Sequence, residues 1–322
     1  MRWKTFGLGI ALAGAGVMGT AEAADWPQSP VQWVVPYPAG GGSDVIARLV
    51  AKQLETTLGQ SLIVENKPGV ATIIGATYVA NAKPDGYIVG TADSGTLAYN
   101  PSMYRSLQYD PAKFTYVGGL ARFPLMLAVP QESPYKTLDE LLAAARAEPE
   151  KLTASSAGSG SPHHLALEMF KQLTDTKIVH VPYKGAAPAI QDLLGRQVDM
   201  SFVDSAAGLS NIKAGKLRVL AVATPNRIDL LPDVPTMAEA GVKNFHAYAW
   251  QGMVGPQNLD AQAQKRMSEA LMQSLQDPAV SQRIRDMGVE PMPMSSDEFR
   301  KFAERERAEW ATVIQRADIR LE

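Results

Sequence analysis

Cysteine is absent from this sequence of 322 residues, and histidine occurs only four times. The absence of cysteine excludes disulfide bonds, thiol catalysis, thiolate metal sites and lipid attachment through a cysteine. Four histidines without a thiolate are a poor donor set for a structural zinc site. We therefore expect no metal and no cofactor.

An excess of charge of one sign is also missing. Lys and Arg number 31 and Asp and Glu number 33, which gives a formal net charge of −2 at pH 7. The charges are interspersed, so no polybasic or acidic tail stands out. Nucleic-acid binding is typically carried by a basic stripe, and we expect no nucleic-acid partner.

Long apolar runs are scarce, and the clearest one covers residues 6–18. Arg2 and Lys4 precede it, and a small-residue motif, Ala21-Glu22-Ala23, follows it. The run is shorter than the about 20 residues that span a bilayer. The pattern predicts a signal peptide at residues 1–23 that is cleaved to give a soluble, exported, periplasmic protein. The alternative, a membrane anchor, is disfavoured because the sequence turns polar at Asp25.

One stretch organises the rest of the chain: an apolar run at 31–35, a glycine-rich turn at 36–44 and apolar residues at helical spacing over 45–58. This pattern predicts a strand, a turn and a helix, with Ser43 or Asp44 as the helix cap. Glycines let backbone N–H groups approach a ligand, and a helix N-terminus attracts an anion. The turn is therefore a candidate anion site, although an ordinary turn that binds nothing has the same pattern.

Further strands and helices alternate along the chain, which predicts α/β units with mostly parallel sheets. We expect polar loops at the carboxyl ends of strands, where ligands bind in such sheets. One loop carries Asp93, Ser94 and Thr96. A second, at 156–161, is rich in Gly and Ser and precedes Pro162, which makes Ser161 a candidate helix cap.

Two apolar segments, 123–130 and 250–256, resemble each other in length and in their terminal proline. We interpret them as strands that cross between two lobes. The predicted lobes are residues 24–125 plus 250–322 and residues 126–249. Two α/β lobes with facing helix N-termini predict a venus-flytrap receptor that closes by a hinge motion.

Several motifs resemble the Bug family, the substrate-binding receptors of tripartite tricarboxylate transporters, over essentially the whole exported part of the chain. They are Pro36-Tyr37-Pro38-Ala39-Gly40-Gly41 with Asp44 and Arg48, Val64-Glu65-Asn66-Lys67-Pro68-Gly69, Pro84-Asp85-Gly86-Tyr87, Gly158-Ser159-Gly160-Ser161 with His164-Leu165, His180-Val181-Pro182-Tyr183-Lys184-Gly185, Asp192-Leu193-Leu194-Gly195, Leu231-Pro232-Asp233-Val234-Pro235-Thr236, and Glu239-Ala240-Gly241.

The resemblance implies a type II periplasmic-binding-protein fold and a small carboxylate held between the lobes by backbone N–H groups, hydroxyls and water. It also implies a membrane permease as partner, and we expect a monomer that is not an enzyme. Together, the resemblance and the sequence pattern give these candidate ligand-binding residues: Tyr37, Ala39, Gly40, Gly41, Gly42, Ser43, Asp44, Val70, Ala71, Thr72, Asp93, Ser94, Thr96, Ser156, Ser159, Ser161, His163, Tyr183 and Asp204.

The sequence departs from the family pattern after the Pro68-Gly69 turn. Family members commonly have small residues there, often paired glycines, whereas this chain has Val70, Ala71, Thr72 and Ile73. We expect this bulk to narrow or reorient the pocket.

Several residues and functions keep an alternative interpretation. Ser161 is a candidate helix cap as well as a ligand contact, and Asp204 is a candidate cap of the turn that follows its strand. His163 and Lys184 are candidate packing or surface residues. An exported sensory receptor has the same binding chemistry and a different membrane partner. An exported Ser/His hydrolase or lyase is disfavoured, because no Gly-x-Ser-x-Gly motif occurs at the serine loops.

Overall fold

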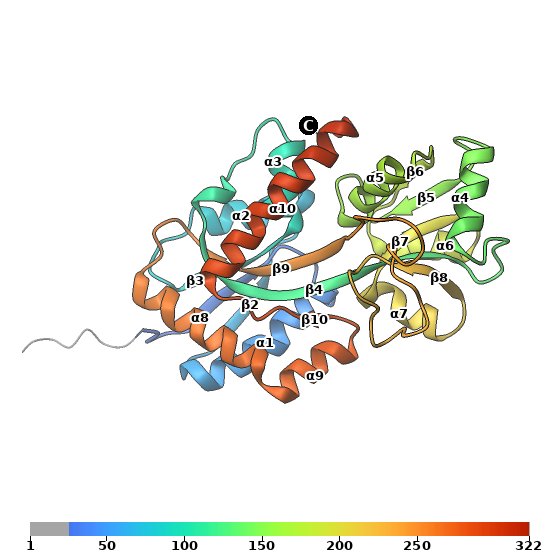
Figure 1. The fold of residues 1–322 in the computed structure, drawn as a ribbon. Helices are drawn as coiled ribbons and strands as arrows, with labels where there is room; N and C mark the ends of the chain where they lie inside the picture. Colours follow the sequence, from blue (N-terminus) through green and yellow to red (C-terminus); the bar gives the residue numbers. More distant parts are fainter. Residues whose placement is uncertain (1–25, 322) are drawn as a thin grey trace, which may run out of the picture.

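The computed structural model describes residues 26–321, so the expected signal peptide lies outside the described residues. Figure 1 shows two α/β lobes joined side by side. The strands are β1 (Val31–Val35), β2 (Leu62–Asn66), β3 (Ile88–Asp93), β4 (Thr115–Pro130), β5 (Thr153–Ser156), β6 (Val179–Pro182), β7 (Met200–Asp204), β8 (Leu217–Val222), β9 (Tyr248–Gly255) and β10 (Glu290–Pro291).

Helices flank these strands in both lobes. They are α1 (Gly42–Leu58), α2 (Ile73–Ala80), α3 (Asn100–Met103), α4 (Leu138–Ala147), α5 (Pro162–Thr174), α6 (Ala186–Leu194), α7 (Ser205–Lys213), α8 (Ala261–Gln276), α9 (Pro278–Asp286) and α10 (Ser296–Arg316), with short helical turns η1 (Val70–Thr72), η2 (Gly95–Tyr99) and η3 (Pro111–Lys113).

The strand order is β2-β1-β3-β9-β4-β7-β5-β6, with β8 and β10 also paired to β4. β1 is parallel to β2 and β3, and β5 is parallel to β6 and β7. β4 is antiparallel to each of its partners. The strand–helix alternation in the sequence predicted these parallel units, because a parallel pair needs a helical crossover.

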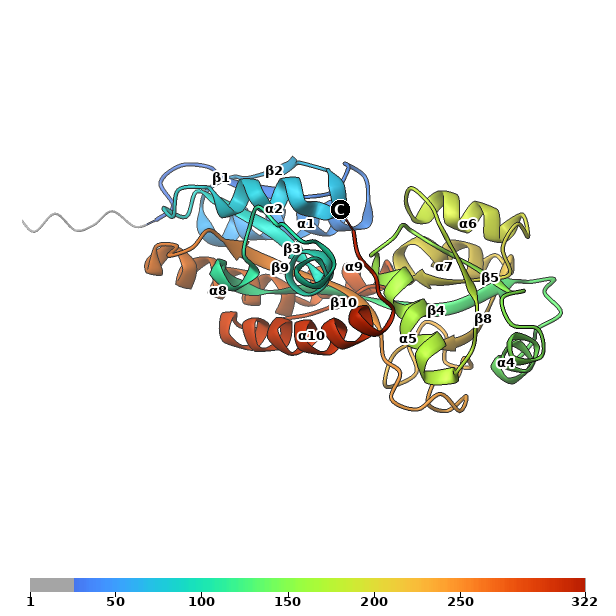
Figure 2. The same cartoon turned by 90° about the horizontal axis from the view of Figure 1, so that it is seen from above.

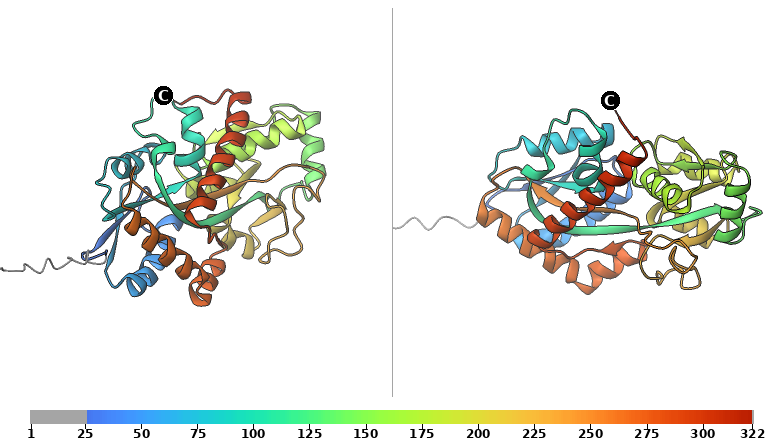
Figure 3. Two further views of the ribbon diagram at one scale, coloured as in Figure 1. Left: turned by 60° about the vertical axis from the view of Figure 1, so that its left-hand side comes forward. Right: turned by 45° about the horizontal axis from the view of Figure 1, so that its top comes forward.

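β4 belongs to both lobes. Its residues up to Pro124 pair with β9, and those from Leu125 onward pair with β7 and β8. Figure 1 and the turned views of Figure 3 show β4 and β9 running side by side between the lobes. On this basis we propose lobe 1 as residues 24–125 plus 250–322 and lobe 2 as residues 126–249.

Successive residues of β1 point to opposite faces of the sheet, as the period of two in a strand requires. Val34 packs in one apolar cluster with residues of α2 and α10. Trp33 and Val35 pack in another with residues of α1 and α8. All three side chains are buried, which explains why the strand has an unbroken apolar sequence.

The sequence prediction for β4 was too short, because the strand begins at Thr115 and not near residue 123. Gly118 and Gly119 interrupt the apolar pattern in the missed part. A β carbon at Gly119 would lie only 2.5 Å from the carbonyl oxygen of Met292. The glycines therefore allow the segment that follows β10 to pack closely against β4. Because glycine has no side chain, they also leave a gap in the apolar pattern from which a strand would be predicted.

Candidate functional site

The glycine turn after β1 leads directly into α1. The N-cap is Gly41, whose side-chain-free backbone is extended, and the helix begins at Gly42. The prediction that Ser43 or Asp44 caps the helix was wrong, because both lie inside the first turn. With no side-chain oxygen at the cap, the first N–H groups of α1 keep their capacity to bind an anion.

Asp44 instead fixes the shape of the turn. It accepts hydrogen bonds from the Gly40 N–H at 2.9 Å, from Arg48 Nε at 3.0 Å and from Asn66 Nδ2 at 2.9 Å. Asp44 is buried, which by itself raises the pKa of its carboxyl, but the bonds from Arg48, Gly40 and Asn66 outweigh burial and lower that pKa. Arg48 therefore neutralises a protein carboxylate, and the anion capacity of the turn comes from backbone groups.

A chain of polar side chains joins the three candidate loops of lobe 1. The Tyr37 hydroxyl donates to Asp93 Oδ2 at the end of β3. Asp93 Oδ1 accepts from the Thr96 N–H at 2.8 Å and from Thr96 Oγ1 at 2.7 Å. Thr96 Oγ1 also lies 2.7 Å from Thr72 Oγ1. The loops at 36–44, 70–72 and 93–96 are thus held in one arrangement.

The turn that departs from the family pattern has an unusual backbone. Ala71 and Thr72 have φ values of 45° and 69°, in the left-handed region that favours glycine. Asn100 Nδ2 donates to the Ala71 carbonyl at 2.9 Å, which stabilises this conformation. Val70 lies in the same turn. Glycines would adopt these angles without strain, so the bulkier Ala71 and Thr72 are held there by their surroundings.

In lobe 2, the loop after β5 is held by its own side chains. Ser156 Oγ accepts from the Gly158 N–H at 3.1 Å and lies 2.7 Å from His180 Nε2. Ser161 is the N-cap of α5 and accepts from the His164 N–H at 3.3 Å, as the sequence predicted. Ser159, between them, is exposed. Of these serines, Ser159 has the hydroxyl that is open to solvent.

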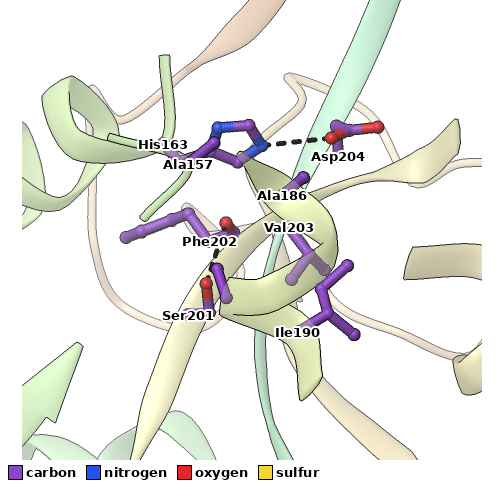
Figure 4. Close-up of a pocket in the computed structure, with 9 residues that line it drawn as sticks. Ala157, His163, Ala186, Ile190, Ser201, Phe202, Val203 and Asp204 are labelled. Carbon is purple, nitrogen blue, oxygen red and sulfur yellow. Dashed lines mark hydrogen bonds and ion pairs between the residues drawn. The ribbon is translucent and has the colours of Figure 1, made fainter. Parts of the chain in front are cut away.

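The buried His163 pairs with the partly buried Asp204, which Figure 4 shows at the edge of a small cavity of about 10 Å³. His163 Nε2 lies 3.1 Å from Asp204 Oδ2. Asp204 is also the N-cap of α7 and accepts from the Ala207 N–H at 2.9 Å. Burial raises the pKa of Asp204, but the His163 bond outweighs it and the pKa is lowered. Asp204 is therefore an anion with two partners.

Tyr183 faces α6 through its hydroxyl, which donates to Asp192 Oδ2 at 2.7 Å. Its N–H donates to the Ser156 carbonyl at 3.0 Å, which places the residue beside the serine loop. The serine loop, Tyr183 and the start of α5, which carries His163, therefore lie side by side in lobe 2. The hydroxyl of Tyr183 is engaged within lobe 2.

The two lobes meet where α1 and α7 begin. A β carbon built on Gly42 would lie 3.5 Å from the β carbon of Ala206. Both helices point their N-terminal ends, with partial positive charge, at this junction. The start of α7 was missed by sequence reasoning, although Asp204 at the end of β7 followed by small residues was an available N-cap signal.

Gln251 is a second residue that the sequence analysis missed. It lies in β9 opposite Asp93, is buried, and its Oε1 accepts from Ser43 Oγ at 2.5 Å. Its Nε2 has no partner among the described residues. A polar glutamine within an otherwise apolar crossing strand, between Trp250 and Gly252, could have identified this position as a candidate site residue. Ser43 is thereby tied to the strand that connects the lobes.

Another cavity, of about 420 Å³, lies elsewhere in lobe 1 and contains none of the candidate residues. Tyr109, Asp110, Lys113 and Gln257 are among its lining residues. Within residues 26–321, no cluster of His, Asp and Glu has the geometry to hold a metal ion. None of the helices in this range is both long and apolar enough to cross a membrane.

In the described part of the chain, a serine hydroxyl pairs with a histidine ring at a buried position. Ser156 Oγ lies beside His180 Nε2, but Ser156 is fully buried and also bonded to Gly158. Burial lowers the pKa of His180 to about 4, and the neighbouring His164 acts in the same direction. A buried hydroxyl beside a weakly basic imidazole is a structural contact and a poor nucleophile.

Two α/β lobes joined by crossing strands, with helix N-termini converging between them, define a periplasmic solute-binding protein. Residues 46–319 match the tripartite tricarboxylate transporter family receptor, and the chain belongs to this family. The resemblance to the Bug family is thereby confirmed, as is the expected two-lobed fold. Members of the family are substrate-binding receptors.

Relatives and solved structures agree with this assignment. BugT of Bordetella pertussis is 33% identical over 319 residues, covering 98% of this chain and 97% of BugT. An R. palustris protein solved with adipate is 34% identical with a TM-score of 0.83, covering 90% of this chain and 98% of that one. MatC from Rhodopseudomonas palustris, solved with bound malate, is 29% identical with a TM-score of 0.80, covering 90% and 100%.

Proposed function

We propose that this protein captures a small dicarboxylate, of the size range of malate to adipate, between its two lobes and delivers it to a membrane permease. The observation that carries the proposal is the pair of helix starts, α1 and α7, that meet between the lobes. The start of α1 has no side-chain cap, so its first N–H groups are free to bind an anion.

The charges around the site favour backbone recognition of that anion. Arg48 is bound to Asp44 and Asn66, and His163 is bound to Asp204. The Arg48 guanidinium is therefore matched by a protein carboxylate. A ligand carboxylate must then take its hydrogen bonds from free N–H groups at the start of α1, such as those of Gly42 and Ser43, from the α7 start, and from hydroxyls such as that of Ser159. The proposed contacts are the candidate residues of the sequence analysis.

The relatives support the choice of ligand class. One structure in the same fold was solved with adipate and another with bound malate. Both compounds carry a carboxylate at each end. A site with one helix start in each lobe is suited to hold a carboxylate at either end of such a molecule.

Isothermal titration calorimetry with malate, adipate, a monocarboxylate and a neutral diamide tests the proposal. We expect one-to-one binding of at least one dicarboxylate, no binding of the diamide, and no product by NMR after long incubation. Binding of the diamide as tightly as the acid, or turnover of any compound, would contradict it. Uptake of the labelled ligand by cells that carry the permease, with and without this protein, tests delivery.

We further propose that residues 1–23 are a cleaved signal peptide and that the exported protein is a monomer. The similarity to the periplasmic binding protein BugD, which is 31% identical with a TM-score of 0.81, supports export. Mass spectrometry of the protein recovered from the periplasm, together with its molar mass in solution, tests both statements.

A further inference from the structure

The chain after α10 turns back onto lobe 1. Leu321 N–H donates to the Met103 carbonyl at 2.9 Å, and Leu321 forms an isolated parallel bridge with Tyr104. Leu321 and Tyr104 also pack against the apolar cluster that contains the buried Met103. Figure 2 and the right-hand view of Figure 3 show this terminal segment passing along the side of lobe 1 that faces α5. The segment is thus fixed to lobe 1 at the junction of the lobes.

The side chains of Met103 and Leu321 also contact lobe 2, at the serine loop of residues 156–161. A β carbon built on Gly160 would lie 2.9 Å from Leu321 Cδ1, 2.9 Å from Met103 Cε and 3.0 Å from Met103 Sδ. Gly160 also has a φ of 76°, in the left-handed region. Its bare α carbon therefore packs directly on two apolar side chains of the other lobe, where any larger residue would displace them.

Gly160 connects the apolar contact with the candidate ligand residues through backbone hydrogen bonds. Its N–H donates to His164 Nδ1 at 3.1 Å, and the adjoining Ser161 N–H donates to the Gly158 carbonyl at 3.1 Å. The exposed Ser159 and the capping Ser161 flank it in the chain. The position of Gly160 therefore sets the position of both serines relative to the start of α5.

We propose that Met103 and Leu321 are positioning residues for ligand capture, forming an apolar clasp that holds the serine loop and favours the closed arrangement of the lobes. The clasp joins residues of different lobes, so it breaks when the lobes separate. A contact present only in the closed state shifts the closed–open equilibrium by its own free energy. It extends the neighbouring contact between α5 and α10, where Gln172 Nε2 donates to the Val313 carbonyl at 3.0 Å.

The absence of cysteine makes a direct test possible in the protein without any ligand. Thr56→Cys on α1 and Ala143→Cys on α4 replace exposed residues, one in each lobe, and accept spin labels for distance measurement by electron–electron resonance. Leu321→Ser, made in this background, removes the Leu321 side of the clasp. We expect its closed-to-open ratio to fall by about fivefold, because the substitution removes apolar packing between the lobes.

Leu173→Ser is the matched control, because it makes the same change at a side chain of α5 that is 47% exposed. We expect this variant to give the parent distance distribution. Circular dichroism checks that each variant is folded, and Met103→Leu, which keeps an apolar side chain, should remain close to the parent. An unchanged distribution in Leu321→Ser, or an equal shift in Leu173→Ser, would overturn the proposal.

The consequence for ligand capture rests on the proposed function and is measured separately. For a dicarboxylate that binds the parent protein, Leu321→Ser should raise the dissociation rate by about fivefold and leave the association rate nearly unchanged. Failure of every dicarboxylate to bind would count against the proposed function alone, since the label distances report on the clasp without a ligand. An unchanged dissociation rate together with a shifted distance distribution would show that the clasp has no role in ligand capture.

Discussion

Single residues in this site cancel one another's charges and leave the backbone free to act. The charge of Asp44 is matched by Arg48, and Asp204 is hydrogen-bonded to His163. Asp93 is held by hydroxyl and N–H donors from Tyr37 and Thr96. Each of these side chains has an internal partner that fixes a loop. Recognition of a ligand carboxylate therefore depends on which N–H groups those loops present.

Gly41→Val tests the backbone groups most simply. Gly41 has a φ of −74°, and a β carbon there meets only the Pro38 carbonyl oxygen, at 3.4 Å, so the fold should accept the change. The added side chain should block close approach of the ligand and weaken dicarboxylate binding by at least tenfold in calorimetry. Gly195→Val is the control, because Gly195 has a φ of −76° and the same 3.4 Å clearance at the end of α6. Equal affinities in both variants would argue against the glycine turn as the anion site.

Tyr37→Phe removes the hydroxyl that donates to the buried carboxylate of Asp93. An unpaired buried acceptor costs about 1–3 kcal/mol, so the free energy of unfolding in urea should fall by that amount. Tyr87→Phe is the control: its hydroxyl accepts a bond at an exposed site, from the Gln28 N–H, and its loss should cost no more than about 0.5 kcal/mol. Comparable decreases in the two variants would mean that the Tyr37–Asp93 bond has no special role.

His180 predicts how stability depends on pH. Burial lowers the pKa of His180 from its ordinary value of 6.5 to about 4. The unfolded chain therefore binds a proton on this residue at higher pH than the folded chain does. The corresponding stability is full above about pH 6.5 and is lost as the pH falls toward about 4. Because His180 is only half-buried, we expect the loss to be about 1 kcal/mol.

Urea unfolding at pH 7 and pH 5 measures this effect. His180→Gln should reduce the loss of stability on acidification. His246→Gln should enlarge it, because the bond to Glu309 raises the pKa of His246 and makes that residue stabilising at low pH and less so as the pH rises. The same pH dependence in both variants and the parent would contradict the assignment.

Among the elements, α5 combines a structural cap with a candidate binding loop. Ser161→Ala removes the cap and should cost about 1 kcal/mol of unfolding free energy and also weaken ligand binding, because the loop before the helix loses its anchor. Thr137→Ala removes the comparable cap of α4, which is part of a capping box with Glu140. That variant should lose similar stability and keep full affinity. Loss of affinity in both would mean that Ser161 acts through stability alone.

Elements with strong local signals could be predicted from the sequence. β1 and the cap Ser161 are where the apolar pattern and the side-chain oxygen indicated. The first part of β4 was not predictable, because its glycines serve contacts with a segment near residue 292 that is remote in sequence. The cap of α1 was assigned wrongly, because Asp44 bonds to Arg48 and Asn66, and the second of these partners comes from another element.

The candidate site shows the same division. The sequence indicated which loops carry small and polar residues. It did not indicate that Tyr37, Asp93, Thr96 and Thr72 form one hydrogen-bonded chain, because those bonds depend on how three strands align in the sheet. Gln251 was missed for a similar reason, since its role follows from its position opposite Asp93. Whether the candidate residues contact a ligand stays a prediction.

At the scale of the whole molecule, the central claim is that a dicarboxylate bridges the lobes. Hydrogen–deuterium exchange, with and without saturating malate or adipate, tests it most directly. We predict slower exchange at residues 39–44 of lobe 1 and, in the same experiment, at residues 157–163 and 204–207 of lobe 2. Protection confined to one lobe, protection around Tyr109 and Lys113, or no protection with any dicarboxylate would contradict the claim.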